Sequence, residues 1–207
     1  MYYPSLHEAV LDLEKHGHLI RIKEPIDPNL ELAHIHRRVV EANGPALLFE
    51  NVLGTPFPCA SNLFGTKQRS QFLFRKTLPK VKKLLSLKAH PEKLLKFWKY
   101  LDLPPLALKA LPKKTLTPKV CANETQIDQL PQIVSWPKDG GAFITLPQVF
   151  TKDPDNPSLL KSNLGMYRIQ LSGGEYIPNK EIGLHYQLHR GIGIHHSGND
   201  SHFSRIS

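Results

Sequence analysis

The chain has 207 residues, of which 40% are hydrophobic and 22% charged, close to the usage of ordinary globular proteins. No stretch approaches the roughly 18 continuous apolar residues of a membrane helix, and the N-terminus lacks the basic and apolar regions of a secretory signal, so we expect neither a membrane-spanning nor a secreted protein. Cys59 and Cys121, the only cysteines, indicate neither a disulfide framework nor a zinc site. We expect a cytoplasmic protein with two reduced, structural cysteines.

The first part of the chain alternates between helical and strand patterns. Apolar residues recur at helical spacing from Ser5 to His16, with Ser5 as a suitable N-cap, Glu8 as its capping-box partner and Gly17 as a stop. This alternation indicates a mixed α+β fold. The elements expected next are a strand over residues 18–22, a helix over 30–43, and buried strands over 46–50 and 58–62.

A basic segment with a helical pattern follows. From Arg75 to Lys119 the chain contains twelve lysines and one arginine against Glu92 and Asp102. Between about Phe72 and Leu111 the pattern is helical, and prolines divide it into two or three short helices. Such an excess of charge attracts phosphates, nucleic acid or an anionic membrane surface. We favour a solvated helical face, because no nucleic-acid module and no interleaved aromatic platform accompanies the lysines, and we expect no nucleic-acid binding.

The last part of the sequence is rich in short β-like runs separated by proline, glycine and aspartate turns. We therefore expect three regions: an N-terminal α+β domain over residues 1–70, a basic helical connector over 71–114, and a β-rich domain over 115–207. The strands expected in the third region lie at residues 132–135, 143–150, 166–171 and 182–188.

Two stretches of this third region carry the residue types of a binding site. In Ser162–Leu171, Arg168 can bind a carboxylate or phosphate with two parallel hydrogen bonds, and Asn163 can offer an oxygen to a hard cation. The stretch from His185 to Gly191 follows at an interval that suits the neighbouring strand of a hairpin. We expect both stretches to meet at one site, although an exposed arginine after an Asn-Leu-Gly turn is also common in proteins without such a site.

The charges and donors in these stretches suit a phosphate-bearing cofactor bridged by a divalent metal. Arg168 and Arg190 would supply positive charge, and Asn163 and His189 would supply mixed oxygen and nitrogen ligands of the kind that manganese accepts. A zinc site is the alternative, but Gly191 and the β-like pattern disfavour the helix that it would need. Its candidate ligands are His185, His189, His195 and His196.

Several segments together resemble the UbiD-type carboxy-lyases, particularly the branch that acts on 3-polyprenyl-4-hydroxybenzoate. Their order and approximate spacing hold from the first helix to about residue 196, so the resemblance covers nearly the whole chain. The matching segments are Gly44–Asn51, Ser61–Thr66, Leu130-Pro131 with Trp136–Asp139 and Ile144-Thr145, Asn163–Arg168, and His189–Gly191.

The resemblance implies a fold and an activity. The fold would be an N-terminal α/β domain followed by the start of a flavin-reductase-like split β-barrel. The activity would be decarboxylation of an aromatic acid, such as 3-polyprenyl-4-hydroxybenzoate in ubiquinone or menaquinone biosynthesis, with prenylated FMN as the electron sink. A flavin prenyltransferase would supply the cofactor. Mn²⁺ is the implied metal ion, with K⁺ as a further candidate.

The resemblance also assigns roles to residues. Asn163 would bind the metal and touch the cofactor phosphate, and Arg168 would be catalytic through its position close to the substrate carboxylate. His189 would be a second metal ligand. The residues expected to contact the flavin are Asn163, Met166, Tyr167, Arg168, His185, Tyr186, Gln187, Arg190 and Gly191.

Family members are about twice as long or more, and their acidic metal ligand and proton donor lie beyond the point that matches Ser207. We therefore expect this chain to be poorly active alone. A truncation, a frame disruption or a split gene product would each explain its length. We expect a partner that carries the missing part to restore activity. A homo-oligomer and peripheral association with the inner membrane are further candidates. The alternative function is a flavin-binding or subunit-interaction module without turnover.

Overall fold

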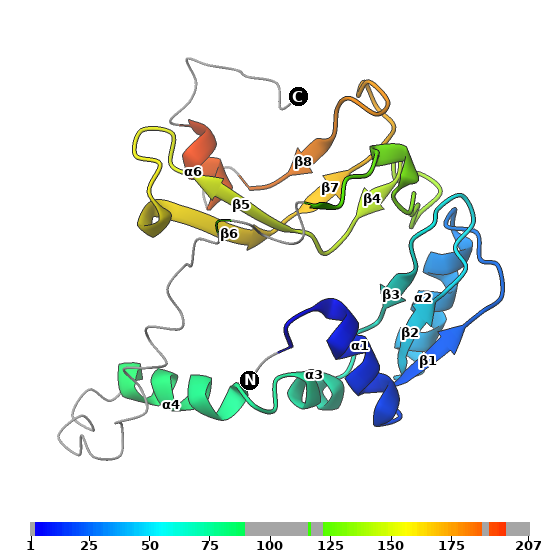
Figure 1. Ribbon diagram of the computed structural model, residues 1–207, viewed down its shortest axis with the longest axis horizontal. Helices are drawn as coiled ribbons and strands as arrows, with labels where there is room; N and C mark the ends of the chain where they lie inside the picture. The colour runs from blue at the N-terminus through cyan, green and yellow to red at the C-terminus, as the bar shows by residue number, and fades with distance from the viewer. Residues whose placement is uncertain (1–2, 90–115, 117–121, 188–190, 198–207) are drawn as a thin grey trace. The chain divides into compact units, whose positions relative to one another are not determined.

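The computed structural model describes residues 3–89, 116, 122–187 and 191–197 (Figure 1). The chain forms two compact units. Unit 1 comprises Met1–Arg21, Val39–Leu48 and Ala60–Leu116, and unit 2 comprises Ile22–Arg38, Phe49–Cys59 and Thr117–Ser207. The boundaries at residues 70 and 114 stay predictions. Within the described ranges, no helix has both the length and the apolar character needed to cross a membrane.

Helices and short strands alternate through the first part of the chain, as predicted. The first three strands form one sheet in the order β1-β2-β3. Beyond α4 the predicted basic connector lies outside the described residues. The elements are α1 (Leu6–Lys15), β1 (Leu19–Ile22), α2 (Glu31–Glu41), β2 (Ala46–Phe49), β3 (Cys59–Ser61), α3 (Lys67–Leu73) and α4 (Leu78–Ala89).

Local sequence signals explain where α1 begins and ends. The Ser5 hydroxyl accepts a hydrogen bond from the Glu8 backbone N–H, and Gly17 adopts a φ of 71° just after the last turn. The apolar face of α1 packs against the sheet and α3, and each Å² of apolar surface removed from water there contributes about 25 cal/mol to stability. One buried apolar cluster of unit 1 consists of Val10, Leu13, Leu19, Ala46 and Leu73.

Cys59 at the start of β3 is a free, buried thiol. Burial raises its pKa to about 11, because the thiolate would lose hydration in the interior. The side chain therefore stays a neutral thiol at physiological pH, which agrees with the predicted structural role. Cys121 lies outside the described residues.

Unit 2 contains two antiparallel sheets, and Figure 1 shows β4, β7 and β8 side by side in one of them. The first sheet has the order β4-β7-β8, and β5 pairs with β6 in the second. The described strands form no closed barrel, so the split barrel stays a proposal. The bounds are β4 (Phe143–Ile144), β5 (Gln148–Lys152), β6 (Ser162–Met166), β7 (Arg168–Gln170), β8 (Gly183–His185), and the short helices η3 (Ile127–Gln129), η4 (Leu159–Lys161) and α6 (Ile192–Ser197).

Two of the expected strands are divided in the structure. The run over residues 143–150 breaks before β5, next to Pro147, which has no N–H to donate to a continuous ladder. The run over 166–171 breaks at Tyr167, where the chain leaves the β5–β6 sheet and enters the β4–β7–β8 sheet. Residues 132–135 form only an isolated bridge, between Val134 and Asn29. The alternation of apolar and polar residues did not predict where these strands break or which strands they pair with.

Candidate functional site

A cavity of about 500 Å³ in unit 2 lies where the two predicted stretches meet. Strands β7 and β8 pair antiparallel, with Arg168 opposite His185, so the predicted hairpin pairing is confirmed. The volume falls in the usual range of small-molecule sites, about 300–1,000 Å³. The cavity is lined by Met166, Tyr167, Arg168, His185, Tyr186, Gln187 and Gly191, all of which the sequence had singled out.

Arg168 is the cation of this cavity, and two residues outside the predicted set hold it. Its Nη2 donates a hydrogen bond of 2.7 Å to Oδ1 of Asp139, whose side chain is only 9% exposed. The guanidinium carbon lies 3.5 Å from the centroid of the Phe143 ring. An ion pair at one edge and an aromatic ring below one face restrict the rotation of the guanidinium.

His185 is fixed on the neighbouring strand by a similar chain of contacts. Its Nε2 lies 3.1 Å from Oε1 of Gln170, and its ring meets the ring of Phe143 edge-on at 5.5 Å. The amide of the buried Gln170 donates hydrogen bonds to the carbonyls of Gly140 and Ser172. With its amide oxygen directed at His185, Gln170 favours the tautomer that carries a proton on Nε2.

Tyr167 occupies the break between β6 and β7 and joins three parts of the site. Its hydroxyl oxygen accepts hydrogen bonds from Nδ2 of Asn163 at 2.8 Å and from the backbone N–H of Ile192 at 3.2 Å. Gly191 passes so close that a Cβ there would lie 2.6 Å from the Tyr167 hydroxyl and 3.0 Å from Oδ1 of Asn163. Its φ of 56° also favours glycine.

The predicted metal ligands are only partly covered by the structure. His189 lies outside the described residues, as does the predicted flavin contact Arg190. Asn163 has its amide nitrogen bound to Tyr167, which leaves the amide oxygen as its remaining acceptor. In the part of the chain that the structure describes, no group of three or more histidine, cysteine, aspartate or glutamate side chains is placed to hold a metal ion.

The histidines of the zinc alternative have separate partners. His185 contacts Gln170, His195 contacts the Thr151 hydroxyl at 2.9 Å, and His196 contacts the Tyr186 hydroxyl. His185 lies in strand β8, in agreement with the β-like pattern that disfavoured a helix through His185 and His189, and His189 lies outside the described residues. His195 and His196 belong to the short helix α6, which begins at Ile192.

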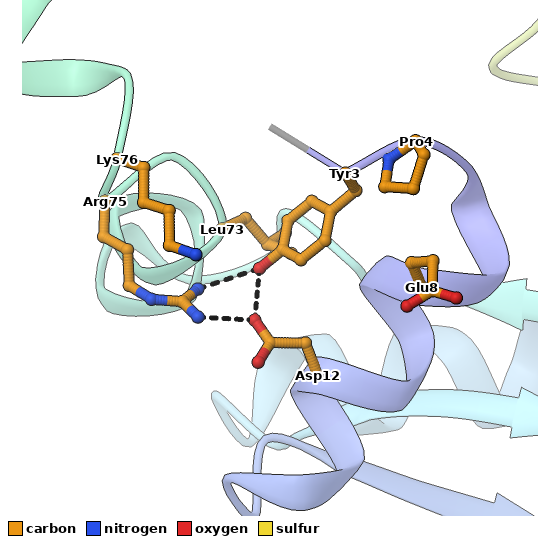
Figure 2. A pocket seen from close by; sticks show the side chains of 7 residues that line it. All are labelled: Tyr3, Pro4, Glu8, Asp12, Leu73, Arg75 and Lys76. Carbon is orange, nitrogen blue, oxygen red and sulfur yellow. Dashed lines mark hydrogen bonds and ion pairs between the residues drawn. The ribbon is translucent and has the colours of Figure 1, made fainter. Parts of the chain in front are cut away.

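A second cavity, of about 220 Å³, lies in unit 1 beside α1. Figure 2 shows Tyr3, Asp12 and Arg75 joined in a closed triangle on one side of it. Burial alone would raise the pKa of Asp12, but hydrogen bonds from Tyr3 and Arg75 outweigh burial and lower it. Arg75 is therefore neutralised by Asp12, and the triangle links the N-terminal segment to the end of α3 instead of presenting a free charge.

Two models of protein-family domains match the chain, one after the other. Residues 10–88 match the 3-octaprenyl-4-hydroxybenzoate carboxy-lyase N-terminal domain, and residues 110–201 match the Rift-related domain of the same carboxy-lyases, together known as UbiD. The two matches together cover well over half of the chain.

Curated relatives include proteins from chlamydiae. A 4-hydroxybenzoate decarboxylase subunit of Chlamydia pneumoniae is 43% identical over 182 residues, which is 86% of this chain and 30% of that protein. A protein of Chlamydia trachomatis is 41% identical over 196 residues, which is 92% of this chain and 32% of that protein. The chain therefore spans about a third of the length of these relatives.

Solved structures of similar fold are UbiD-class enzymes. An evolved dimeric form of HmfF from Pelotomaculum thermopropionicum, in complex with prFMN, matches with a TM-score of 0.68 at 20% identity, covering 96% of this chain and 42% of that chain. The closed form of vanillic acid decarboxylase from Sedimentibacter hydroxybenzoicus matches with a TM-score of 0.68 at 23% identity, covering 97% and 41%. These likenesses show a shared mixed α/β fold.

Proposed function

The chain belongs to the UbiD family of carboxy-lyases, and from this we propose that it forms the flavin site of a prenylated-FMN-dependent decarboxylase. Its substrate would be an aromatic acid such as 3-polyprenyl-4-hydroxybenzoate, in ubiquinone or menaquinone biosynthesis. The observation that carries the proposal is the cavity where Met166, Tyr167 and Arg168 meet His185, Tyr186 and Gln187. Relatives that bind prFMN or decarboxylate 4-hydroxybenzoate support it.

The described residues suit a flavin nucleotide. The cavity is large enough for a small ligand, and Gly191 lets the chain pass close to Tyr167 and Asn163, where a Cβ would clash with the Tyr167 hydroxyl. Arg168 supplies a charged fork for a phosphate or carboxylate, and the rings of Tyr167, Tyr186 and His185 supply flat surfaces. Arg190 would add a further contact to the flavin nucleotide.

When bound, prenylated FMN supplies the electron sink for the loss of CO₂. The chain itself would orient the acid. Arg168 would bind the leaving carboxylate, with its guanidinium held in place by Asp139 and Phe143. Because the cation is already held in position, less entropy is lost when the acid is oriented for reaction. Asn163 would touch the phosphate end of the cofactor.

The metal ion is less well matched by the described residues than the flavin. Asn163 alone offers one neutral oxygen, whereas Mn²⁺ and K⁺ need several donors, so the described set does not make a metal site. We therefore derive no step from the metal. Its binding would depend on His189 and on a carboxylate from a partner chain.

The proposed setting is the cytoplasm, with peripheral association at the inner membrane. A flavin prenyltransferase would supply the cofactor, and a second polypeptide that carries the remaining part would complete the enzyme. The chain would also form a homo-oligomer. The dimeric form of HmfF and the chlamydial relative, which is itself one subunit of a decarboxylase, support assembly with another chain.

A second function, flavin binding or subunit interaction without turnover, is favoured by one observation. None of the described residues that line the cavity is a carboxylic acid, so the described lining lacks the carboxylic acid that the family resemblance implies as proton donor, and proton transfer by a positioned side chain is worth about 10²–10⁴-fold in rate. The two functions are distinguished by adding a polypeptide that carries the remaining part of a UbiD-family protein and then measuring CO₂ release and flavin binding. CO₂ release from an aromatic acid is expected for the enzyme, and flavin binding without CO₂ release is expected for the module.

Arg168→Ala is expected to weaken FMN binding by about tenfold or more, because one charge-assisted hydrogen bond contributes about 1.5–3 kcal/mol and 1.4 kcal/mol corresponds to a factor of ten. Titration of FMN fluorescence with the purified chain measures the dissociation constant. Lys161→Ala, which removes an exposed cation from the same unit, is the control and should leave the constant unchanged. Equal constants for Arg168→Ala and the unaltered chain would contradict the assignment of Arg168.

A further inference from the structure

Asp139 combines two features that a surface carboxylate does not have. Its side chain is nine-tenths buried, and its Oδ2 is enclosed without a hydrogen-bond partner among the described residues. Its Oδ1 binds Arg168 at 2.7 Å. A buried carboxylate is costly unless it is paired, so this single ion pair compensates its charge.

The loop that carries Asp139 is held firmly in unit 2. The Asp139 N–H bonds to the carbonyl of Trp136, and the Gln170 amide binds the carbonyl of Gly140. Gly141 lies so close to the turn after β7 that a Cβ there would be 1.8 Å from the carbonyl oxygen of Ser172. Asp139 therefore presents its carboxylate to Arg168 from a nearly fixed position.

The contacts of Arg168 divide its guanidinium into a held part and a free part. Nη2 binds Asp139, and the ring of Phe143 lies under the guanidinium at 3.5 Å. Stacking on a ring leaves the in-plane N–H donors available, and no described residue accepts a hydrogen bond from Nε or Nη1. These donors are available to an anionic group in the cavity that Arg168 lines.

We propose that Asp139 is a positioning residue that fixes the guanidinium of Arg168 so that an N–H donor that Asp139 leaves free, on Nε or on Nη1, binds the anionic group of the ligand. The inference rests on the proposed flavin site. Phe143 supports the same orientation from below the guanidinium plane, and it links Arg168 to His185 on the neighbouring strand. Asp139 acts only through Arg168, and this dependence is what the experiment measures.

The test uses the full chain with Asp139→Asn, and Asp155→Asn as a control that neutralises an exposed carboxylate of the same unit. The first readout needs no ligand: the side-chain Nε–H signal of Arg168 in a ¹H–¹⁵N spectrum, assigned by its loss in Arg168→Met. The signal should shift toward the position of free arginine in Asp139→Asn and stay in place in Asp155→Asn. An unchanged signal in Asp139→Asn would overturn the proposal.

The second readout is FMN affinity in a double-mutant cycle. Asp139→Asn should weaken FMN binding about tenfold in the unaltered chain and have no further effect in the Arg168→Met background. An equal loss in both backgrounds would indicate a structural role for Asp139 and overturn the proposal. If the unaltered chain binds no FMN, the proposed function fails, and the Arg168 signal still decides whether Asp139 positions the guanidinium.

Discussion

Arg69→Met should lower the free energy of unfolding by about 3 kcal/mol or more, because it removes a buried cation that satisfies three backbone carbonyls. Arg69 is only 3% exposed and donates to the carbonyls of Gly44, Asn62 and Leu63. It thereby joins the turn before β2 to the loop after β3. Burial lowers the pKa of its guanidinium, and no carboxylate accepts a hydrogen bond from it in the described part of unit 1.

Lys67→Met is the matched control, since it removes an exposed cation from the same helix. Urea denaturation followed by circular dichroism measures both variants against the unaltered chain. The control is expected to change the free energy of unfolding by less than about 0.5 kcal/mol, as surface substitutions do. Similar losses in the two variants would show that the carbonyl contacts of Arg69 contribute little.

Gly173→Ala is expected to destabilise unit 2 by about 3 kcal/mol or more, because it combines a left-handed backbone with a clash that cannot relax. Gly173 has a φ of 87°, and its Cβ would lie 1.8 Å from the carbonyl oxygen of Gly140. The same carbonyl accepts a hydrogen bond from Gln170, which holds His185. The substitution should therefore disturb the cavity as well as the stability.

Gly174→Ala separates the clash from the backbone conformation. Gly174 has a φ of 63°, but the nearest atom to its Cβ would be 3.9 Å away, so only the left-handed conformation is penalised, by about 1–2 kcal/mol. Thermal or urea unfolding, followed by circular dichroism, compares the two variants. Equal destabilisation would contradict the close approach of the two turns.

Local signals in the sequence predicted the elements of the first part of the chain. The Ser5 cap, the Gly17 stop and the apolar spacing of α1 act over a few residues, so a sequence pattern contains all the information. The pairing of β7 with β8 was predicted in the same way, from one interval between two motifs.

Contacts between distant residues were not predictable in this way. Asp139 and Arg168 are 29 positions apart, and nothing in the sequence connects the aspartate of the Trp-Pro-Lys-Asp run with that arginine. The change of sheet at Tyr167 depends on which strands are available as partners, and the helix α6 depends on how Gly191 turns the chain. The spacing of apolar residues along a strand or a helix carries no information about the change of sheet at Tyr167 or about the turn at Gly191.

The most direct test of the flavin site is to purify the chain after co-expression with a flavin prenyltransferase and to measure its absorbance, the mass of its bound ligand and its manganese content. We predict bound prenylated FMN in close to one equivalent, with little flavin in Arg168→Ala, because Arg168 lines the cavity with a fixed charge. A folded chain that carries no flavin, and that binds none when FMN is added, would contradict the proposed function.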